Sequence, residues 1–192
     1  MKKKILIAAA AAIVSCGGSS WVDPTTGTFS TQDSADIMSM ISGAVSAVAT
    51  SPGQQAPLQG SKALTQSTTL QCAVSGTVTV NTTVNSAICD SAGTSCNFDA
   101  SVGLTLNDCR TQTLIGTDGL TAHVWGSETV SGSTVTSFDV HEVIQGGITI
   151  KRVSDGTTIG TCGINVEARV TYDGTTETVH VTGTVCKQAM AQ

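Results

Sequence analysis

Charged and aromatic side chains are scarce in this chain of 192 residues. Only 12% of the residues are charged, against about a quarter in an ordinary globular protein. Aromatic residues make up 3%, while threonine, serine, glycine and valine are abundant. This balance is typical of a β-rich secreted protein and excludes a helical bundle or coiled coil. The hydrophobic fraction of 40% is sufficient for a core and excludes wholesale disorder.

Basic residues are also few once the lysines at positions 2–4 are set aside. They form no stripe or cluster along the remaining chain. Because binding to DNA or RNA needs a concentrated positive surface, we expect no nucleic-acid partner. The remaining basic residues are Lys62, Arg110, Lys151, Arg152, Arg169 and Lys187.

The apolar run at the start of the chain is too short to span a membrane. It follows the leading lysines and extends over residues 5–14. A helix of this length rises about 15 Å, half of a hydrocarbon core about 30 Å thick. A basic start followed by a short apolar run predicts an export signal over residues 1–15 that is cleaved from the mature protein.

The residues that close this run, Ile13-Val14-Ser15-Cys16, resemble the lipobox of bacterial lipoproteins. The resemblance covers residues 1–16 and implies that a diacylglyceryl group modifies the Cys16 thiol, with fatty acyl groups such as palmitate. In that family, a residue other than Asp after the cysteine, here Gly17, favours the outer membrane. Several acyl chains on Cys16 would make a stable anchor. The alternative is a plain secretory signal in which Cys16 is incidental.

Seven cysteines would leave one thiol unpaired in an exported protein. If lipid occupies Cys16, an even set of six is left, which predicts three disulfides in an oxidising compartment. No C-x-x-C spacing occurs, so we expect no zinc ribbon or zinc finger and assign no residue as a metal ligand. Sequence alone allows many pairings; the ones we expect are Cys72 with Cys109, Cys89 with Cys96, and Cys162 with Cys186.

The mature chain divides by composition into a tether, a helix, a linker and a β-domain. Residues 16–32 begin with glycine and serine and read as a flexible tether. Residues 33–49 predict an amphipathic helix, with Asp33 or Ser34 as its cap. Residues 50–68, with two prolines and several glutamines, read as a linker. The helical stripe consists of Ile37, Met38, Ile41, Ala44, Val45 and Val48.

From Thr69 to the end of the chain, aliphatic and polar residues alternate in segments, as in half-buried strands. We therefore predict an all-β domain over 69–192, mainly an antiparallel meander forming a sandwich or small soluble barrel, with the single helix before it. The predicted hairpin turns are Asp118-Gly119, Ser131-Gly132, Gly146-Gly147, Asp155-Gly156 and Asp173-Gly174.

Two hairpin registers carry specific expectations. A turn centred on Asp173-Gly174 places Ala168 opposite Val179, buries Val179 and Val181, and leaves His180 and Thr182 outside. It leaves Cys186 one position away from Cys162, a gap that a bulge or frayed strand end would close.

A turn at Ser131-Gly132 makes Trp125 and Phe138 neighbours and puts His123 and Val140 on the same face. This face could receive the helix or could bind a ligand or partner.

The polar residues around His141 are the remaining candidates for chemistry. Asp139 and His141 share one face of a strand, so the carboxylate could orient the imidazole, with Arg152 as an ion partner. A solvated cluster of polar side chains explains the same residues. We find no G-x-S-x-G, H-E-x-x-H, P-loop or EF-hand pattern, assign no catalytic residue and expect no cofactor.

Two functions follow as hypotheses. The first is a lipid-anchored envelope protein at the outer membrane whose β-domain binds or scaffolds an envelope protein or another ligand without catalysis. The second is a periplasmic or surface hydrolase, or a metal-dependent enzyme, that uses Asp139 and His141. An enzyme should bring a histidine, a carboxylate and a nucleophile or metal together in a pocket, whereas a binding module should not.

Overall fold

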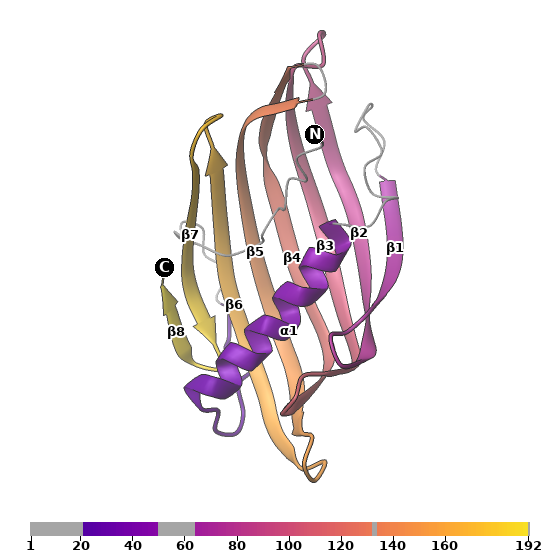
Figure 1. Ribbon diagram of the computed structural model, residues 1–192, viewed down its shortest axis with the longest axis vertical. Helices are drawn as coiled ribbons and strands as arrows, with labels where there is room; N and C mark the ends of the chain where they lie inside the picture. Colours follow the sequence, from indigo (N-terminus) through magenta and orange to yellow (C-terminus); the bar gives the residue numbers. More distant parts are fainter. Residues whose placement is uncertain (1–20, 50–63, 132–133, 192) are drawn as a thin grey trace.

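The computed structural model describes residues 21–49, 64–131 and 134–191. One helix and eight strands follow each other along the chain, and the strands form one antiparallel sheet in sequence order (Figure 1). The predicted all-β meander with one N-terminal helix is confirmed, and the helix, not a second sheet, forms the second layer. The elements are α1 (Thr31–Ala49), β1 (Leu64–Gln71), β2 (Ser75–Cys89), β3 (Ser95–Arg110), β4 (Leu114–Ser131), β5 (Thr134–Arg152), β6 (Thr158–Tyr172), β7 (Glu177–Val185) and β8 (Gln188–Ala191).

Several predicted segments lie outside the described residues. These are the export signal, Cys16, the first part of the tether, and residues 50–63 of the linker. The rest of the predicted linker, residues 64–68, belongs to β1, so the sheet begins before Thr69. No helix within the described ranges is long and apolar enough to cross a membrane.

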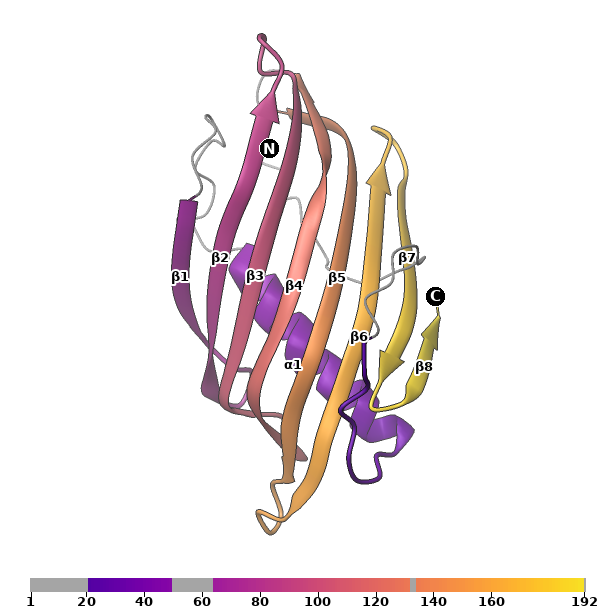
Figure 2. The same ribbon diagram turned by 180° about the vertical axis from the view of Figure 1, so that it is seen from behind.

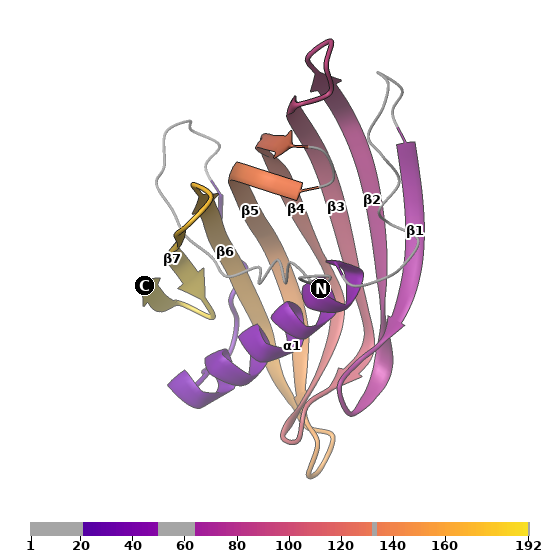
Figure 3. The same ribbon diagram turned by 45° about the horizontal axis from the view of Figure 1, so that its top comes forward.

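The sheet has two chemically different faces because successive side chains of a strand point to opposite sides. We call the face on which α1 packs the inner face and the opposite one the outer face. Figures 1 and 3 show α1 crossing the inner face diagonally. The inner face holds the core, in which Ile37 of α1 and Ile148 of β5 are both 0% exposed. Burial of aliphatic side chains from α1 and the central strands therefore holds the two layers together.

The helix begins at Thr31, two residues earlier than the predicted Asp33. Ser30 is the cap: its Oγ accepts a hydrogen bond from the Asp33 backbone N–H at 3.1 Å. The Asp33 carboxylate in return accepts from the Ser30 N–H at 2.8 Å. Both candidate cap residues therefore lie inside the helix, and Asp33 completes a reciprocal capping arrangement with Ser30.

Part of the predicted flexible tether is bound to the sheet. Thr26 donates its backbone N–H to the Thr161 carbonyl at 2.9 Å, and the Thr25 hydroxyl accepts from the Gly163 N–H at the same distance. Because β7 pairs with β6 only from Ile164 onward, this segment covers the edge of β6 that β7 leaves open. Figure 2 shows it beside β6, with α1 behind the sheet.

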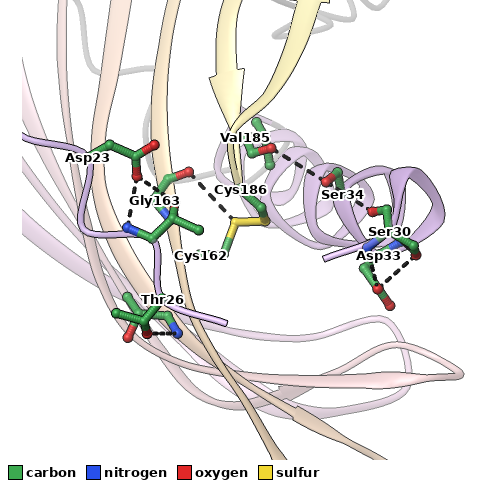
Figure 4. The surroundings of a disulfide bond; sticks show 11 residues. Asp23, Thr26, Ser30, Asp33, Ser34, Cys162, Gly163, Val185 and Cys186 are labelled. Atoms are coloured by element: carbon green, nitrogen blue, oxygen red, sulfur yellow. Dashed lines mark hydrogen bonds between the residues drawn. A yellow bond between two sulfur atoms is a disulfide. The ribbon is translucent and has the colours of Figure 1, made fainter. Parts of the chain in front are cut away.

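Gly163 is required where this segment approaches the sheet. A Cβ at Gly163 would lie 2.2 Å from the Asp23 carboxylate and 2.8 Å from Pro24 Cδ. Figure 4 shows Asp23, Gly163 and the neighbouring disulfide together. Residues 23–27 thus hold the outer side of β6 while α1, a few residues later, packs on the inner face.

The three predicted disulfides are confirmed. Cys72 is bonded to Cys109, Cys89 to Cys96, and Cys162 to Cys186. The last pair is buried beneath the start of α1 (Figure 4). The gap expected between its two cysteines is closed by a tight turn, because Cys186 and Lys187 have φ of 51° and 67° and connect β7 to β8.

The β6–β7 hairpin has a longer loop than predicted. Residues 173–176 form the connection, and the Asp173 carboxylate accepts hydrogen bonds from the backbone N–H groups of Thr175 and Thr176. Ala168 therefore lies opposite Val181 and not Val179. Since the register differs by an even number of residues, the faces are unchanged. Val181 is buried and His180 is exposed, as predicted, whereas Val179 and Thr182 are both half-buried.

The register of the β4–β5 hairpin differs from the predicted register by an odd number of residues. The side chains of one strand therefore lie on the face opposite to the predicted one. Trp125 lies opposite His141 in place of Phe138, because the register shifts again between Thr129 and Val130. The prediction that Trp125 and Phe138 are neighbours on one face is wrong. Phe138 lies on the inner face, where its ring is 5.5 Å from that of Tyr172.

Two of the predicted turns are internal to strands. Asp118-Gly119 lies within β4, where Asp118 has φ of 82° beside an irregularity in the β3–β4 pairing. Gly146-Gly147 lies within β5. Glycine and aspartate at these places allow a local distortion of a long strand and do not reverse the chain.

Candidate binding site on the outer face

All three histidines of the chain lie on the outer face. His123 is on β4, His141 on β5 and His180 on β7. The cross-strand partners form a row in which Asp99 lies opposite Trp125, Trp125 opposite His141, His141 opposite Arg169, and Arg169 opposite His180. A single line across five strands thus brings four ionisable side chains, Asp99, His141, Arg169 and His180, next to Trp125 or to one another.

The centre of this row is a stack of three rings. The Trp125 ring lies 4.7 Å from that of His123 and 5.4 Å from that of His141, with interplanar angles of 28° and 13°. His123 is two residues before Trp125 on the same strand, and His141 is its partner on the next strand. We call His123, Trp125 and His141 the ring stack. Such contacts contribute about 0.5–1.5 kcal/mol each beyond area burial and restrict the rotamers of all three rings.

Each histidine of the ring stack is oriented by a carboxylate. His123 Nε2 lies 2.7 Å from Asp99 Oδ2, and His141 Nε2 lies 3.4 Å from Asp139 Oδ1. Asn85 on β2 donates to the other oxygen of Asp99 at 2.5 Å. Hydrogen bonds from Asn85 and His123 lower the pKa of Asp99, so this carboxylate is ionised at neutral pH.

Arg169 is the cation of the cluster. Its Nε and Nη2 donate to the two oxygens of Asp139 at 3.0 and 2.7 Å, a bidentate arrangement. This contact lowers the pKa of Asp139 and raises that of Arg169, so the pair is fully charged at neutral pH. Both side chains keep considerable exposure to solvent, 50% for Arg169 and 36% for Asp139.

The sequence located part of this cluster. His123 and Trp125 share a face, and so do Asp139 and His141, as predicted. Arg152 is not the partner of Asp139: it lies at the far end of β5, opposite Leu114. Arg169 takes that role because β6 places it opposite His141.

Val140 and Phe138 belong to the opposite face from the ring stack. Val140 lies opposite Gly126 on β4 and Val170 on β6, and Val170 is buried in the inner face. The sequence around three members of the cluster does not mark them as site residues. These are Asn85, Asp99 and Arg169, which join the cluster only through the register of their strands.

A hollow of about 470 Å³ adjoins the ring stack on the same face. It extends over β2 to β5 and is bordered at one end by His123. Its residues are Asn81, Thr83, Ser101, Val102, Gly103, Thr121, Ala122, His123, Val143 and Gln145.

The arrangement does not assemble a hydrolytic site from the described contacts. Ser101 lies opposite His123 in register, but its hydroxyl accepts a hydrogen bond from Asn85 at 3.0 Å, and no bond between Ser101 and the imidazole is found there. Nor do three His, Cys, Asp or Glu side chains converge as metal ligands in the part of the chain that the structure describes. What the geometry offers is a rigid set of oriented donors, acceptors and rings on a sheet surface.

The inner face also carries a largely buried acidic side chain, that of Glu142. Glu142 follows His141 on β5 and lies opposite Val124 and Ala168. Burial among such neighbours raises the pKa of Glu142 to about 7. This group belongs to the apolar layer and not to the cluster around the ring stack.

Comparison with known protein families, curated proteins and solved structures finds no match to this chain.

Proposed function

We propose that the protein is exported, anchored to the outer membrane by lipid on Cys16, and uses the outer face of its β-domain to bind an envelope component without catalysis. The observation that carries the binding role is the continuous network from Asn85 through Asp99, the ring stack and Asp139 to Arg169. The anchor rests on the lipobox-like residues 13–16.

Stability alone does not account for this network. Exposed ion pairs contribute only about 0–1 kcal/mol each, and the inner face already provides a buried core with a buried disulfide. A face that only has to remain soluble needs no stacked rings or shared hydrogen bonds. Oriented side chains on rigid strands instead lower the entropy that binding costs, which favours a recognition surface.

The alternative hydrolase or metal-dependent enzyme receives less support. Nε and Nη2 of Arg169 donate to the two oxygens of Asp139. These bonds stabilise the ionised carboxylate and oppose a role of Asp139 as a proton donor. His141 has this carboxylate as its partner, but an enzyme of this kind also needs a nucleophile or a metal ion next to the imidazole. That group would have to arrive together with the substrate.

The binding role can be tested by photo-crosslinking in intact cells. A photoreactive residue at Thr121, which is exposed beside the hollow, should give a discrete adduct with an envelope component. The same residue at Ser154, in the exposed β5–β6 loop, is the control and should give none. Combining the Thr121 probe with Trp125→Ala should abolish the adduct. No adduct, or equal adducts at both positions, would contradict a binding outer face.

The anchor is tested separately. Mass spectrometry of the mature N-terminal peptide should show a diacylglyceryl-modified and acylated Cys16. A mature protein with an unmodified Cys16 thiol would refute the lipid anchor and leave the binding role to be judged on its own experiment.

A further inference from the structure

The hollow on the outer face is open at its centre because Gly103 has no side chain. This residue lies on β3 between Asn81 of β2 and Thr121 of β4, in register with both. A Cβ placed on Gly103 would find no atom nearer than 3.9 Å, so the space above it is open. The volume of about 470 Å³ lies within the range of about 300–1,000 Å³ that is usual for small-molecule sites.

Six of the ten residues around this space carry a hydrogen-bonding side chain, and none carries a permanent charge. Hydroxyl groups come from Thr83, Ser101 and Thr121, carboxamides from Asn81 and Gln145, and an imidazole from His123. Each hydroxyl and each carboxamide both donates and accepts hydrogen bonds. Val143 adds an apolar wall, whereas Val102 and Ala122 belong to strand positions that face inward and contribute mainly backbone.

Three of these polar groups are held in place by neighbours outside the hollow. The Gln145 amide donates to Asn165 Oδ1 at 2.9 Å, the Ser101 hydroxyl accepts from the Asn85 amide at 3.0 Å, and His123 Nε2 lies 2.7 Å from Asp99 Oδ2. Trp125 stacks against the His123 ring. Because these side chains are already oriented, a ligand loses less entropy when it binds to them.

This chemistry discriminates among ligand classes. An anion or metal ion would call for permanently charged side chains, and an apolar ligand would leave the hydroxyls and carboxamides without partners. A hydroxyl-rich neutral ring satisfies both kinds of group: its hydroxyls pair with the polar rim and its C–H face can rest on Val143.

We propose that this hollow binds a neutral saccharide, of one or two sugar units. The inference rests on the proposed function, since it names the chemical class of ligand that the outer face would bind. The imidazole of His123 connects the sugar site to the ring stack, so ligand binding changes the surroundings of Trp125.

The direct test is NMR titration of the full chain in detergent with glucose, galactose, N-acetylglucosamine, cellobiose and chitobiose. At least one should cause saturable shifts of the Gly103 and Thr121 amides and of the His123 ring. Absence of saturable shifts with all of these sugars at millimolar concentration would overturn the proposal, as would shifts confined to residues outside the hollow.

Gly103→Leu fills the hollow without backbone strain, because no positive φ is required there. We expect it to weaken sugar binding by about tenfold or more, equal to about 1.4 kcal/mol. The matched control is Thr105→Leu, two residues further along β3 on the same face and outside the hollow, which should bind as the wild type does.

Gln145→Ala is a second variant that removes a hydrogen-bonding group without adding bulk, and it should weaken binding several-fold. Unchanged binding in Gly103→Leu and Gln145→Ala, both with wild-type near-UV circular dichroism, would overturn the site. If no sugar binds while the Thr121 adduct persists, the saccharide inference fails and the binding face stands. If both are absent, both fail.

Discussion

The inner and outer faces of the sheet are built from alternate residues of the same strands, yet one face is buried and apolar and the other is accessible and polar. On β5, Ile144, Ile148 and Ile150 are buried in the inner-face core, while His141, Val143 and Gln145 on the outer face contribute to the ring stack and the hollow. The inner face gains stability by excluding water, and the outer face keeps polar groups oriented but accessible. The proposed recognition by the outer face should therefore be separable from the stability provided by the inner face, and substitutions can test this separation.

Loss of the Cys162–Cys186 disulfide, both of whose cysteines are buried, should have a larger effect than loss of the Cys89–Cys96 disulfide or any of the substitutions below. Replacing Cys162 and Cys186 together by Ala removes a cross-link over 24 residues, a loop entropy worth about 3.5 kcal/mol, together with packing in the core. The pair Cys89→Ala and Cys96→Ala, with a separation of 7 residues, should cost about 2.5 kcal/mol. Guanidinium unfolding of both double variants gives the difference, and equal losses would contradict it.

A truncation within the core should cost almost as much. Ile148→Ala creates a cavity where the side chain is 0% exposed, and we expect a loss of about 3 kcal/mol. Thr149→Ala, at the next residue and on the outer face, should cost less than about 1 kcal/mol. Urea unfolding with intact disulfides measures the free energy of unfolding of both variants. Similar losses would contradict the claim that the inner face provides most of the stability.

Glu142 should make the inner face sensitive to pH. Its pKa of about 7 in the folded state exceeds the ordinary value of 4.5, so the folded state prefers the protonated form. On account of this group, stability is greatest below pH 4.5 and is lost as pH rises through about 7.

Glu142→Gln should therefore stabilise the protein at about pH 8 by on the order of 2 kcal/mol and flatten the pH profile. Below pH 4.5, where Glu142 is neutral in both states, the variant and the wild type should be nearly equal in stability. Thermal unfolding across this pH range checks the slope. A variant whose profile parallels that of the wild type would show that the Glu142 carboxyl is not desolvated.

The outer cluster should contribute least to stability. Asp139→Asn removes the charge that holds Arg169 and orients His141, but both members of the ion pair are substantially exposed. We expect a loss below about 1 kcal/mol in urea unfolding. NMR should nevertheless show altered His141 ring signals. A loss of several kcal/mol would mean that the outer face is structural.

The alternation of small aliphatic and polar residues was sufficient to predict the class of fold, because it identifies strands in a chain with few competing signals. The cysteine count predicted the number of disulfides, three, but it did not determine their pairing, and the expected pairing was one choice among many. The registers could not be predicted equally well, because they depend on loop length and on irregularities within long strands.

The two hairpins whose registers were predicted wrongly show how a register error changes the face on which a side chain lies. In the β6–β7 hairpin the side chain of Asp173 stabilises a four-residue loop, and the even shift preserved the faces of Val181 and His180. In the β4–β5 hairpin the odd shift exchanged the faces of Phe138 and Val140 relative to Trp125. The cluster around Arg169 depends on three strand pairings at once, so local sequence could not have assembled it.

The segment that covers the edge of β6 also limits where the domain can be. If Cys16 carries lipid as proposed, only six residues, 17–22, lie between the lipidated cysteine and Asp23, which lies against Gly163 of β6, and not the full tether over 16–32. Fully extended, the chain from Cys16 to Asp23 spans about 25 Å. Asp23 would therefore remain within about 25 Å of the acylated cysteine, and a binding partner would have to reach the domain in the layer next to the headgroups.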